Sequence, residues 1–372
     1  MTEQTHSFQP DWVSPPGETI ADLLEERDWT QKDLAGRLGY SRKHVSQLVT
    51  GKAPVTEDTA LRLERVLGST ASFWLSREAR YRERLARQQY RVKLEEWTDW
   101  LDELPVKNLM RAGAIPDRQN RGRNKPQIVD SLLHFFGVAS PEEWREHYGA
   151  LQGAFRRARA DQSDDAAIAA WLRMGEREAE AIEAERFDER RFRQALDAVR
   201  GLTREPADAI GPELVERCRR AGVVVVFVDH LPRTHVSGVA RWLNPHCALI
   251  QLSLYGKWND RMWFTFFHEA AHLLLHSKDK KQVFLDDPGG VQSDTDQERE
   301  ADAWAADFLI PPAARHRLQY LADAGGVQAF AEELGIHPGI VVGRMQHEGL
   351  LDHRTPLNRL KERFRIVQEE TP

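Results

Sequence analysis

The segment His268-Glu269-Ala270-Ala271-His272 contains the residue types of a metal-dependent hydrolase. On a helix, two histidines four residues apart lie one turn from each other on the same face, so both imidazoles can bind one ion. Neutral imidazole suits zinc, which it binds at about 2.0–2.1 Å. Glu269 follows the first histidine, where its carboxylate can take the proton of an activated water. The pattern predicts one zinc ion held by His268 and His272, with Glu269 as the general base.

A catalytic zinc site needs a third protein ligand and one open position. A histidine ten residues after the first would be one solution, but Lys278 occupies that position. A carboxylate from a following helix is the other solution, and Glu298 opens an acidic helix that we expect to reach Ile310. Asp302 lies one turn after Glu298 and can orient a histidine ring through its second nitrogen. Glu300 points to another side of that helix and is the reserve choice as ligand.

His276 is a third histidine on the same predicted helix. It lies two turns beyond His268 but is rotated by about 80° around a helix of 3.6 residues per turn. Its ring is either a hydrogen-bond donor on the substrate side or a helix-end group that complements the helix dipole, and we favour the second interpretation. A five-residue pattern of this kind also arises by chance on surface helices. The apolar run 263–267 before it favours a buried helix instead.

The segment FTFFHEAAHLLLH, followed by QEREADAWAADFLIP, resembles the ImmA/IrrE family of metallopeptidases over about residues 215–315. The resemblance implies metal ligands at His268, His272 and Glu298, with Glu269 as the base. Asp302 stands where asparagine is frequent in that family, and both side chains can hydrogen-bond a ligand. Relatives cleave phage or stress-response repressors, so the resemblance implies regulated cleavage of a DNA-binding protein.

Three apolar segments precede the histidine helix and read as strands of a small sheet, namely 223–228, 236–242 and 248–252. The histidine helix itself is expected over about 260–276. A polar loop over 277–297 then leads to the acidic helix 298–310, which Pro311-Pro312 stops. Strands beside helices in one block predict an α+β domain around the metal site.

Near the N-terminus, short apolar patterns alternate with helix caps and glycines. Thr30 followed by Asp33 forms an N-terminal capping signal for a second helix, which ends at Gly39. Ser41 can cap a third helix, 42–50, which Gly51 ends, and Thr56 can cap a fourth. Two short helices joined by a turn that contains glycine predict a helix-turn-helix motif.

In that motif the second helix enters the major groove of DNA with its N-terminal residues at the base edges. The side chains there can read guanine and adenine edges or contact phosphate: Ser41, Arg42, Lys43, His44, Ser46 and Gln47. Lys32 and Lys52 flank the helix and can contact phosphates. The alternative is a generic helical bundle with a solvated polar face. The order of caps and glycines favours DNA binding.

The stretch TQKDLAGRLGYSRKHVSQLVTGKAPVTEDTALRLERVLGSTASFWL resembles HigA-type antitoxins, within the Cro and lambda-repressor class, over about residues 14–80. The resemblance implies a homodimeric repressor that binds operator DNA, often the operator of its own toxin–antitoxin operon. A toxin protein is then the implied partner.

Composition limits the remaining classes of function. The formal net charge of −6 excludes a chain coated with nucleic acid, so DNA contact must come from a local basic face. Cys218 and Cys247 are too few for a disulfide framework and lack the spacing of a thiolate metal site. No apolar run reaches the roughly 20 residues that span a bilayer, and the first residues lack a signal-peptide core. We expect a cytoplasmic protein without a membrane partner.

The patterns predict a mainly α chain with an α+β C-terminal part. The expected parts are a flexible lead-in at 1–13, a helix-turn-helix domain of four to five helices at 14–76, a helical middle or linker region at 77–205, a small-sheet zincin-like domain at 206–315 and a helical C-terminal subdomain at 316–372. Two hypotheses follow for the whole chain. It is an antitoxin-type repressor whose zincin-like domain senses or binds a partner, or an active metallo-endopeptidase that cleaves a repressor or other regulatory protein.

Overall fold

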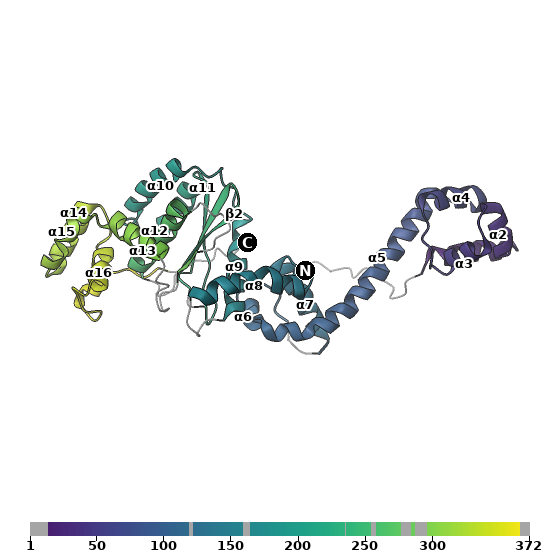
Figure 1. The fold of residues 1–372 in the computed structure, drawn as a ribbon, viewed down its shortest axis with the longest axis horizontal. Coiled ribbons are helices and arrows are strands. Elements are labelled where there is room, and N and C mark those ends of the chain that lie inside the picture. The colour runs from purple at the N-terminus through teal and green to yellow at the C-terminus, as the bar shows by residue number, and fades with distance from the viewer. Residues whose placement is uncertain are drawn as a thin grey trace, which may run out of the picture. The chain divides into compact units, whose positions relative to one another are not determined.

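The computed structural model describes residues 14–118, 122–158, 164–234, 236–253, 258–276, 284–286 and 296–364. The chain forms two compact units, one ending at Thr98 and the other beginning at Asp99. The first is helical and the second has a small sheet among helices (Figure 1). The predicted fold class, mainly α with an α+β C-terminal part, is confirmed. Among the described residues, no helix is long and apolar enough to cross a membrane. The predicted lead-in lies outside the described residues.

The N-terminal unit consists, in its described part, of α1 Pro16–Glu25, α2 Gln31–Leu38, α3 Arg42–Val49, α4 Glu57–Leu67 and α5 Ala71–Glu96. Side-chain caps begin α2, α3 and α4 as the sequence predicts. Thr30 and Asp33 form a reciprocal capping box at α2, and the Ser41 hydroxyl accepts a hydrogen bond from the backbone N–H of His44 at α3. Gly39 ends α2 with φ of 71°, in the left-handed region that glycine adopts without strain. One core holds the helices together, and its fully buried members include Ile20, Leu34, Val45, Leu63 and Trp74.

The predicted boundary after residue 76 falls inside α5, which continues to Glu96 without interruption. A 3-10 helix, η1 Trp97–Glu103, follows directly. The division of the remaining chain at residues 205 and 315 stays a prediction.

The C-terminal unit contains the helices α6 Val106–Arg111, α7 Lys125–Phe136, α8 Pro141–Ala158, α9 Asp165–Ala179, α10 Glu189–Leu202, α11 Ala207–Arg219, α12 Asn259–Leu275, α13 Asp296–Leu309, α14 Pro312–Arg315, α15 Ala324–Leu334 and α16 Pro338–His347. Short 3-10 helices lie at η2 Gly122–Asn124, η3 Leu318–Tyr320 and η4 Pro356–Leu360. Its strands are β1 Val223–Phe227, β2 Gly238–Asn244, β3 Cys247–Leu252 and β4 Phe284–Asp286.

The strands form one sheet in the order β1-β3-β2-β4. β1 pairs with β3 in parallel, while β2 pairs with both β3 and β4 in antiparallel register. The three apolar segments predicted as strands are therefore strands. The prediction of an uninterrupted loop over 277–297 is wrong at β4. A strand of three residues is too short to show an alternating pattern, and it exists because β2 offers an edge for pairing.

Helices cover both faces of the sheet. Because successive strand residues point to opposite faces, Val225 and its partner Ile250 face the core that α10, α11 and α12 share. The neighbouring position Gln251 faces α9, where its amide donates to the Trp171 carbonyl oxygen at 2.7 Å. Helices from the predicted middle region thus complete the core around the sheet.

The segment α15–α16 has the outline of a second helix-turn-helix, with Gly335 at a φ of 69° between the helices. In the structure α16 packs against α12, and most of its length is buried. Gly339 and Gly343 allow this approach, because a Cβ at Gly343 would come within 2.4 Å of the Asp260 carboxylate. α16 therefore serves as a packing element of the C-terminal unit.

Candidate functional site

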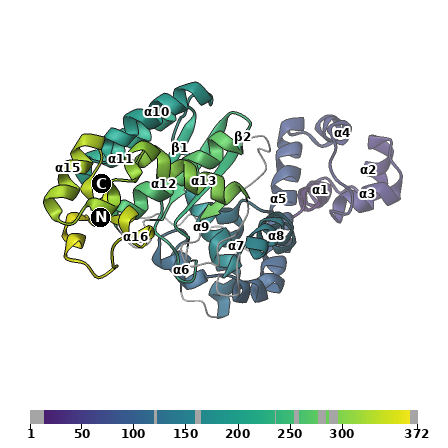
Figure 2. The ribbon, with the colours of Figure 1, turned by 60° about the vertical axis from the view of Figure 1, so that its left-hand side comes forward.

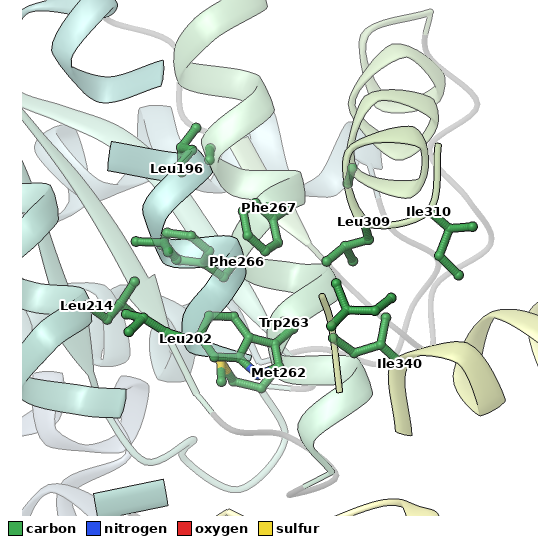
Figure 3. Packing of buried hydrophobic residues seen from close by; sticks show 14 of the residues in the cluster. Leu196, Leu202, Leu214, Met262, Trp263, Phe266, Phe267, Leu309, Ile310 and Ile340 are labelled. Atoms are coloured by element: carbon green, nitrogen blue, oxygen red, sulfur yellow. The ribbon is translucent and has the colours of Figure 1, made fainter. Parts of the chain in front are cut away.

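Helix α12 carries the HExxH motif in a buried position. His268, Glu269 and His272 are 3%, 0% and 1% exposed. The opposite side of α12 holds the helix in place through Met262, Trp263, Phe266 and Phe267, which Figure 3 shows among leucines of α10, α11 and α13. α13 runs beside α12 and brings its acidic first turns to the motif (Figure 2).

Three side-chain atoms of the kind that bind metals converge where α12 and α13 meet. The Nε2 atoms of His268 and His272 lie 3.0 Å apart, and Glu298 Oε2 lies 3.1 Å from the first and 3.5 Å from the second. Tetrahedral zinc with ligand distances near 2.0–2.1 Å requires ligand atoms about 3.3 Å apart. Two imidazole nitrogens and a carboxylate oxygen in this arrangement fit a zinc ion. Among the described residues they form the His-His-Glu cluster that could hold a metal.

The electrostatics of this cluster favour the protonation states that bind metal. Burial, with the neighbouring His268 adding to it, lowers the pKa of His272 to about 4 against the opposing effect of Glu298. Burial alone would raise the pKa of Glu298, but its contacts with the two histidines outweigh burial and hold that pKa at about 2. At neutral pH His272 is therefore neutral and Glu298 is ionised, as metal ligands must be.

Two further acids of α13, Asp302 and Glu300, contact histidines from outside the cluster. Asp302 Oδ1 lies 2.9 Å from His268 Nδ1, the ring nitrogen that faces away from Glu298. Glu300, the reserve ligand of the sequence analysis, is not in the cluster; its Oε2 lies 3.1 Å from Nε2 of His276. His276 ends α12 as expected, but its ring is buried and its Nδ1 lies 3.1 Å from Nδ1 of His272.

Glu269 lies where α12 passes beneath the start of β2. A Cβ added at Gly238 would come within 2.8 Å of Glu269 Oε1 and 2.6 Å of the Thr265 methyl group. The absence of a side chain at this strand position therefore leaves the space that the Glu269 carboxylate occupies. Sequence analysis did not identify Gly238, because only the packing of β2 on α12 shows its role.

A cavity of about 390 Å³ borders the cluster through Asp302 and Thr265. Its wall is apolar at Leu309 of α13, at Ile310 directly after that helix and at Ile340 of α16, and the cationic side chains of Arg261 and Arg344 also line it. Asp302 contacts His268, so the cavity lies beside the His-His-Glu cluster.

The predicted DNA-reading residues lie together at the start of α3. Ser41, Arg42, Lys43 and Ser46 are exposed, while His44 and Gln47 are half-buried. Val45 and Leu48 point into the core, so the exposed residues share the outer face of the helix. Tyr40 holds His44 by an edge-on ring contact at 4.6 Å between centroids. Lys32 and Lys52 are also exposed.

Comparison with known proteins finds a family model for each of two segments of the chain. Residues 20–74 match the family model described as helix-turn-helix, and residues 243–345 match the peptidase family model described as IrrE N-terminal-like domain. The second match extends beyond α13 to include α15 and most of α16.

One curated relative is the uncharacterized HTH-type transcriptional regulator YddM of Escherichia coli (strain K12). It is 33% identical over 61 residues, which cover 16% of this chain and 65% of that protein, just under two thirds of its length.

Two solved structures are also similar to a part of the chain. One is described as an antidote protein of a plasmid maintenance system from Nostoc punctiforme, with 31% identity and a TM-score of 0.22, covering 23% of this chain and 94% of that one. The other is an addiction module antidote protein of a HigA family from Coxiella burnetii, with 32% identity and a TM-score of 0.21. The match covers 23% of this chain and 92% of that one. From the two family matches, the chain combines an N-terminal helix-turn-helix DNA-binding domain with a C-terminal IrrE-like domain of a metallopeptidase family.

Proposed function

We propose that the chain is an operator-binding transcriptional regulator whose C-terminal domain is a zinc-dependent endopeptidase that cleaves a repressor or other regulatory protein. The observation that carries the proposal is the convergence of His268, His272 and Glu298 beside the buried carboxylate of Glu269. A domain that only binds a partner does not need a base and three metal ligands buried at one point.

Each residue of the centre has a distinct part in this proposal. His268 and His272 would hold the ion through Nε2, and Glu298 would be the third ligand. A zinc ion bound there supplies the Lewis acid that makes water a nucleophile near neutral pH. Glu269 accepts the proton of the attacking water and returns it to the leaving amine. Asp302 accepts from the Nδ1–H of His268 and so keeps that ring in the tautomer with Nε2 available.

The substrate lies, in this proposal, along the cavity that borders Asp302 and Thr265. Its apolar wall suits an aliphatic or aromatic side chain next to the cleaved bond, and the guanidinium group of Arg261 suits a carboxylate farther along the peptide. The N-terminal domain binds operator DNA through the exposed face of α3 and brings the peptidase to proteins that act at the same promoter.

The metal content of the purified protein tests whether the cluster binds zinc. The purified full-length chain is expected to contain about one zinc ion, and the His268→Ala variant to contain none. The His316→Ala variant, which removes an exposed histidine away from the cluster, is the control. No zinc in the unchanged protein under metal-replete conditions would rule out the metal centre.

The Glu269→Gln change tests catalysis, because it leaves the three ligands in place. Cells that express the unchanged protein are expected to contain new protein N-termini that are absent with the variant. Both proteins should bind operator DNA equally. Identical sets of N-termini would mean that the domain is a scaffold, and the peptidase proposal would fail while DNA binding stands.

The antitoxin role is the second candidate, and the match of residues 20–74 to a helix-turn-helix family supports the operator binding that it requires. In this form the chain is a cytoplasmic homodimer that represses its own operon and binds a toxin protein. Light scattering is expected to give twice the chain mass. Expression of the chain should restore growth to cells that produce a toxin encoded by the adjacent gene. The Glu269→Gln variant should restore growth as well as the unchanged protein does. If growth is restored only when Glu269 is present, the chain does not act as an antitoxin by binding alone.

A further inference from the structure

We infer that His276 and Glu300 form a positioning pair that orients His272 in the metal centre. The inference rests on the proposed zinc site, and it gives a role to two residues that the ligand set does not use. His276 ends α12 and is 8% exposed. Its two ring nitrogens make two different contacts, with Nδ1 3.1 Å from His272 Nδ1 and Nε2 3.1 Å from Glu300 Oε2.

The contact between two Nδ1 atoms determines where the protons lie. Only one of the two nitrogens can carry the hydrogen of a hydrogen bond, while the other accepts. His272 must keep the lone pair of Nε2 for the ion, so its neutral ring carries the proton on Nδ1 and donates it to His276. His276 is then the tautomer with its proton on Nε2, which donates to Glu300. Both contacts are satisfied by this one assignment.

The two histidine ligands therefore receive different kinds of support from α13. The carboxylate of Asp302 reaches His268 directly. The carboxylate of Glu300 is 66% exposed at the edge of the site and contacts His276 rather than His272. The ring of His276 connects the buried ligand to this outer carboxylate. Such outer contacts fix the orientation of the ring and raise its basicity as a ligand.

A purely structural histidine would fill the same space at the end of the helix, so the test must separate packing from hydrogen bonding. His276→Leu keeps most of the volume and removes the acceptor. His276→Asn retains an oxygen near the position of Nδ1 and can accept from His272. The matched control is His316→Leu, at an exposed histidine remote from the cluster.

Zinc affinity of the full-length chain is the first measurement, by competition with a chromophoric chelator. His276→Leu is expected to weaken zinc binding by about 10–100-fold, the usual effect of removing an outer-shell partner, while His276→Asn recovers most of the affinity. The visible spectrum of the Co²⁺ form should change with His276→Leu and stay close to that of the unchanged protein with His276→Asn. Unchanged zinc affinity and an unchanged Co²⁺ spectrum in His276→Leu would overturn the inference.

A double-mutant cycle tests whether Glu300 acts through His276. Glu300→Gln is expected to weaken zinc binding in the unchanged protein and to have no further effect in the His276→Leu background. Asp307→Asn, which removes an exposed acid on the same helix, should have no effect in either background. Equal effects of Glu300→Gln in both backgrounds would contradict the pair. If the unchanged protein binds no zinc, the proposed metal centre is wrong. If it binds zinc and the His276→Leu and Glu300→Gln variants bind zinc with the same affinity, only the positioning role of the pair is wrong.

Discussion

The Asp302 carboxylate lies 2.9 Å from Nδ1 of the His268 ring, whose Nε2 faces Glu298 Oε2 at 3.1 Å. Asp302 and Glu298 are one turn apart on α13, so a single helix supplies contacts to both nitrogens of the same imidazole. The ring is therefore held at both ends by one rigid element. This arrangement makes the position of Nε2 depend on how α13 packs against α12.

We expect Asp302→Ala to weaken zinc binding by about 10–100-fold, because His268 loses the acceptor that fixes its tautomer. Asp302→Asn should have a smaller effect, since its amide oxygen still accepts from Nδ1–H. Competition with a chelator measures both variants. An Asp302→Ala protein with unchanged zinc affinity would contradict the role of this carboxylate.

The sequence predicted that His268, His272 and Glu298 lie together because these residues follow helical periodicity, and their role as metal ligands stays a prediction. His268 and His272 are four residues apart, as are Glu298 and Asp302, and such pairs share a helix face in any fold. The rotation of α13 around its own axis is not encoded in that spacing. It decides that Glu298 enters the cluster while Glu300 contacts His276, and only the packed structure shows it.

Other features depend on contacts between distant segments. β4 is a strand because β2 pairs with it, and its three residues carry no pattern of their own. Gly238 is indistinguishable in the sequence from a turn glycine. The N-terminal helices were predicted closely because caps such as Thr30 and Ser41 act within one turn of the chain.

Gly238→Ala is expected to disturb the base without removing a ligand. The added methyl group would lie within 2.8 Å of Glu269 Oε1 and 2.6 Å of the Thr265 methyl, so the strand or the carboxylate must move. Overpacking of this kind costs about 1–3 kcal/mol. We expect a lower melting temperature and loss of the new protein N-termini, with zinc content retained. Gly201→Ala, in open space on α10, is the control and should not lower stability. A Gly238→Ala protein as stable and active as the unchanged one would contradict the packing of β2 on α12.

The outer face of α3 predicts two kinds of DNA contact. Arg42→Ala is expected to weaken binding to an operator selected from random duplexes by about 1–3 kcal/mol and to relax the base preference at one position. Lys52→Ala should weaken binding to all sequences alike and lower the slope of affinity against salt by about one. Arg87→Ala serves as the control, since Arg87 is exposed on α5 and pairs with Glu83. If Arg42→Ala instead lowers only the slope of affinity against salt and leaves the base preference unchanged, Arg42 contacts a phosphate and not a base.

An ion pair between the buried Arg241 and the half-buried Glu176 joins the sheet to α9, and it predicts how stability depends on pH. Arg241 of β2 contacts Glu176 Oε1 at 2.6 Å, and Arg173 contacts Oε2 at 2.9 Å. Burial acts to raise the pKa of Glu176, but the two guanidinium groups outweigh it and hold that pKa below its ordinary value of 4.5. We expect Glu176→Gln to lower the free energy of unfolding at pH 7 by about 3 kcal/mol, because Arg241 is left buried without its counter-ion.

The sign of the pH dependence follows from the lowered pKa. A carboxylate with a lower pKa in the folded state contributes its full stabilisation above the unfolded pKa and loses it as pH falls through the folded value. The difference in unfolding free energy between the unchanged protein and Glu176→Gln should therefore be constant near neutral pH and shrink below about pH 4.5. Urea unfolding at several pH values measures this difference. Glu189→Gln, which removes a solvent-exposed pair with Arg193, should change stability by less than about 1 kcal/mol throughout. A difference for Glu176→Gln that grows on acidification would mean that the carboxyl is held protonated in the fold, because only a raised pKa gives that sign.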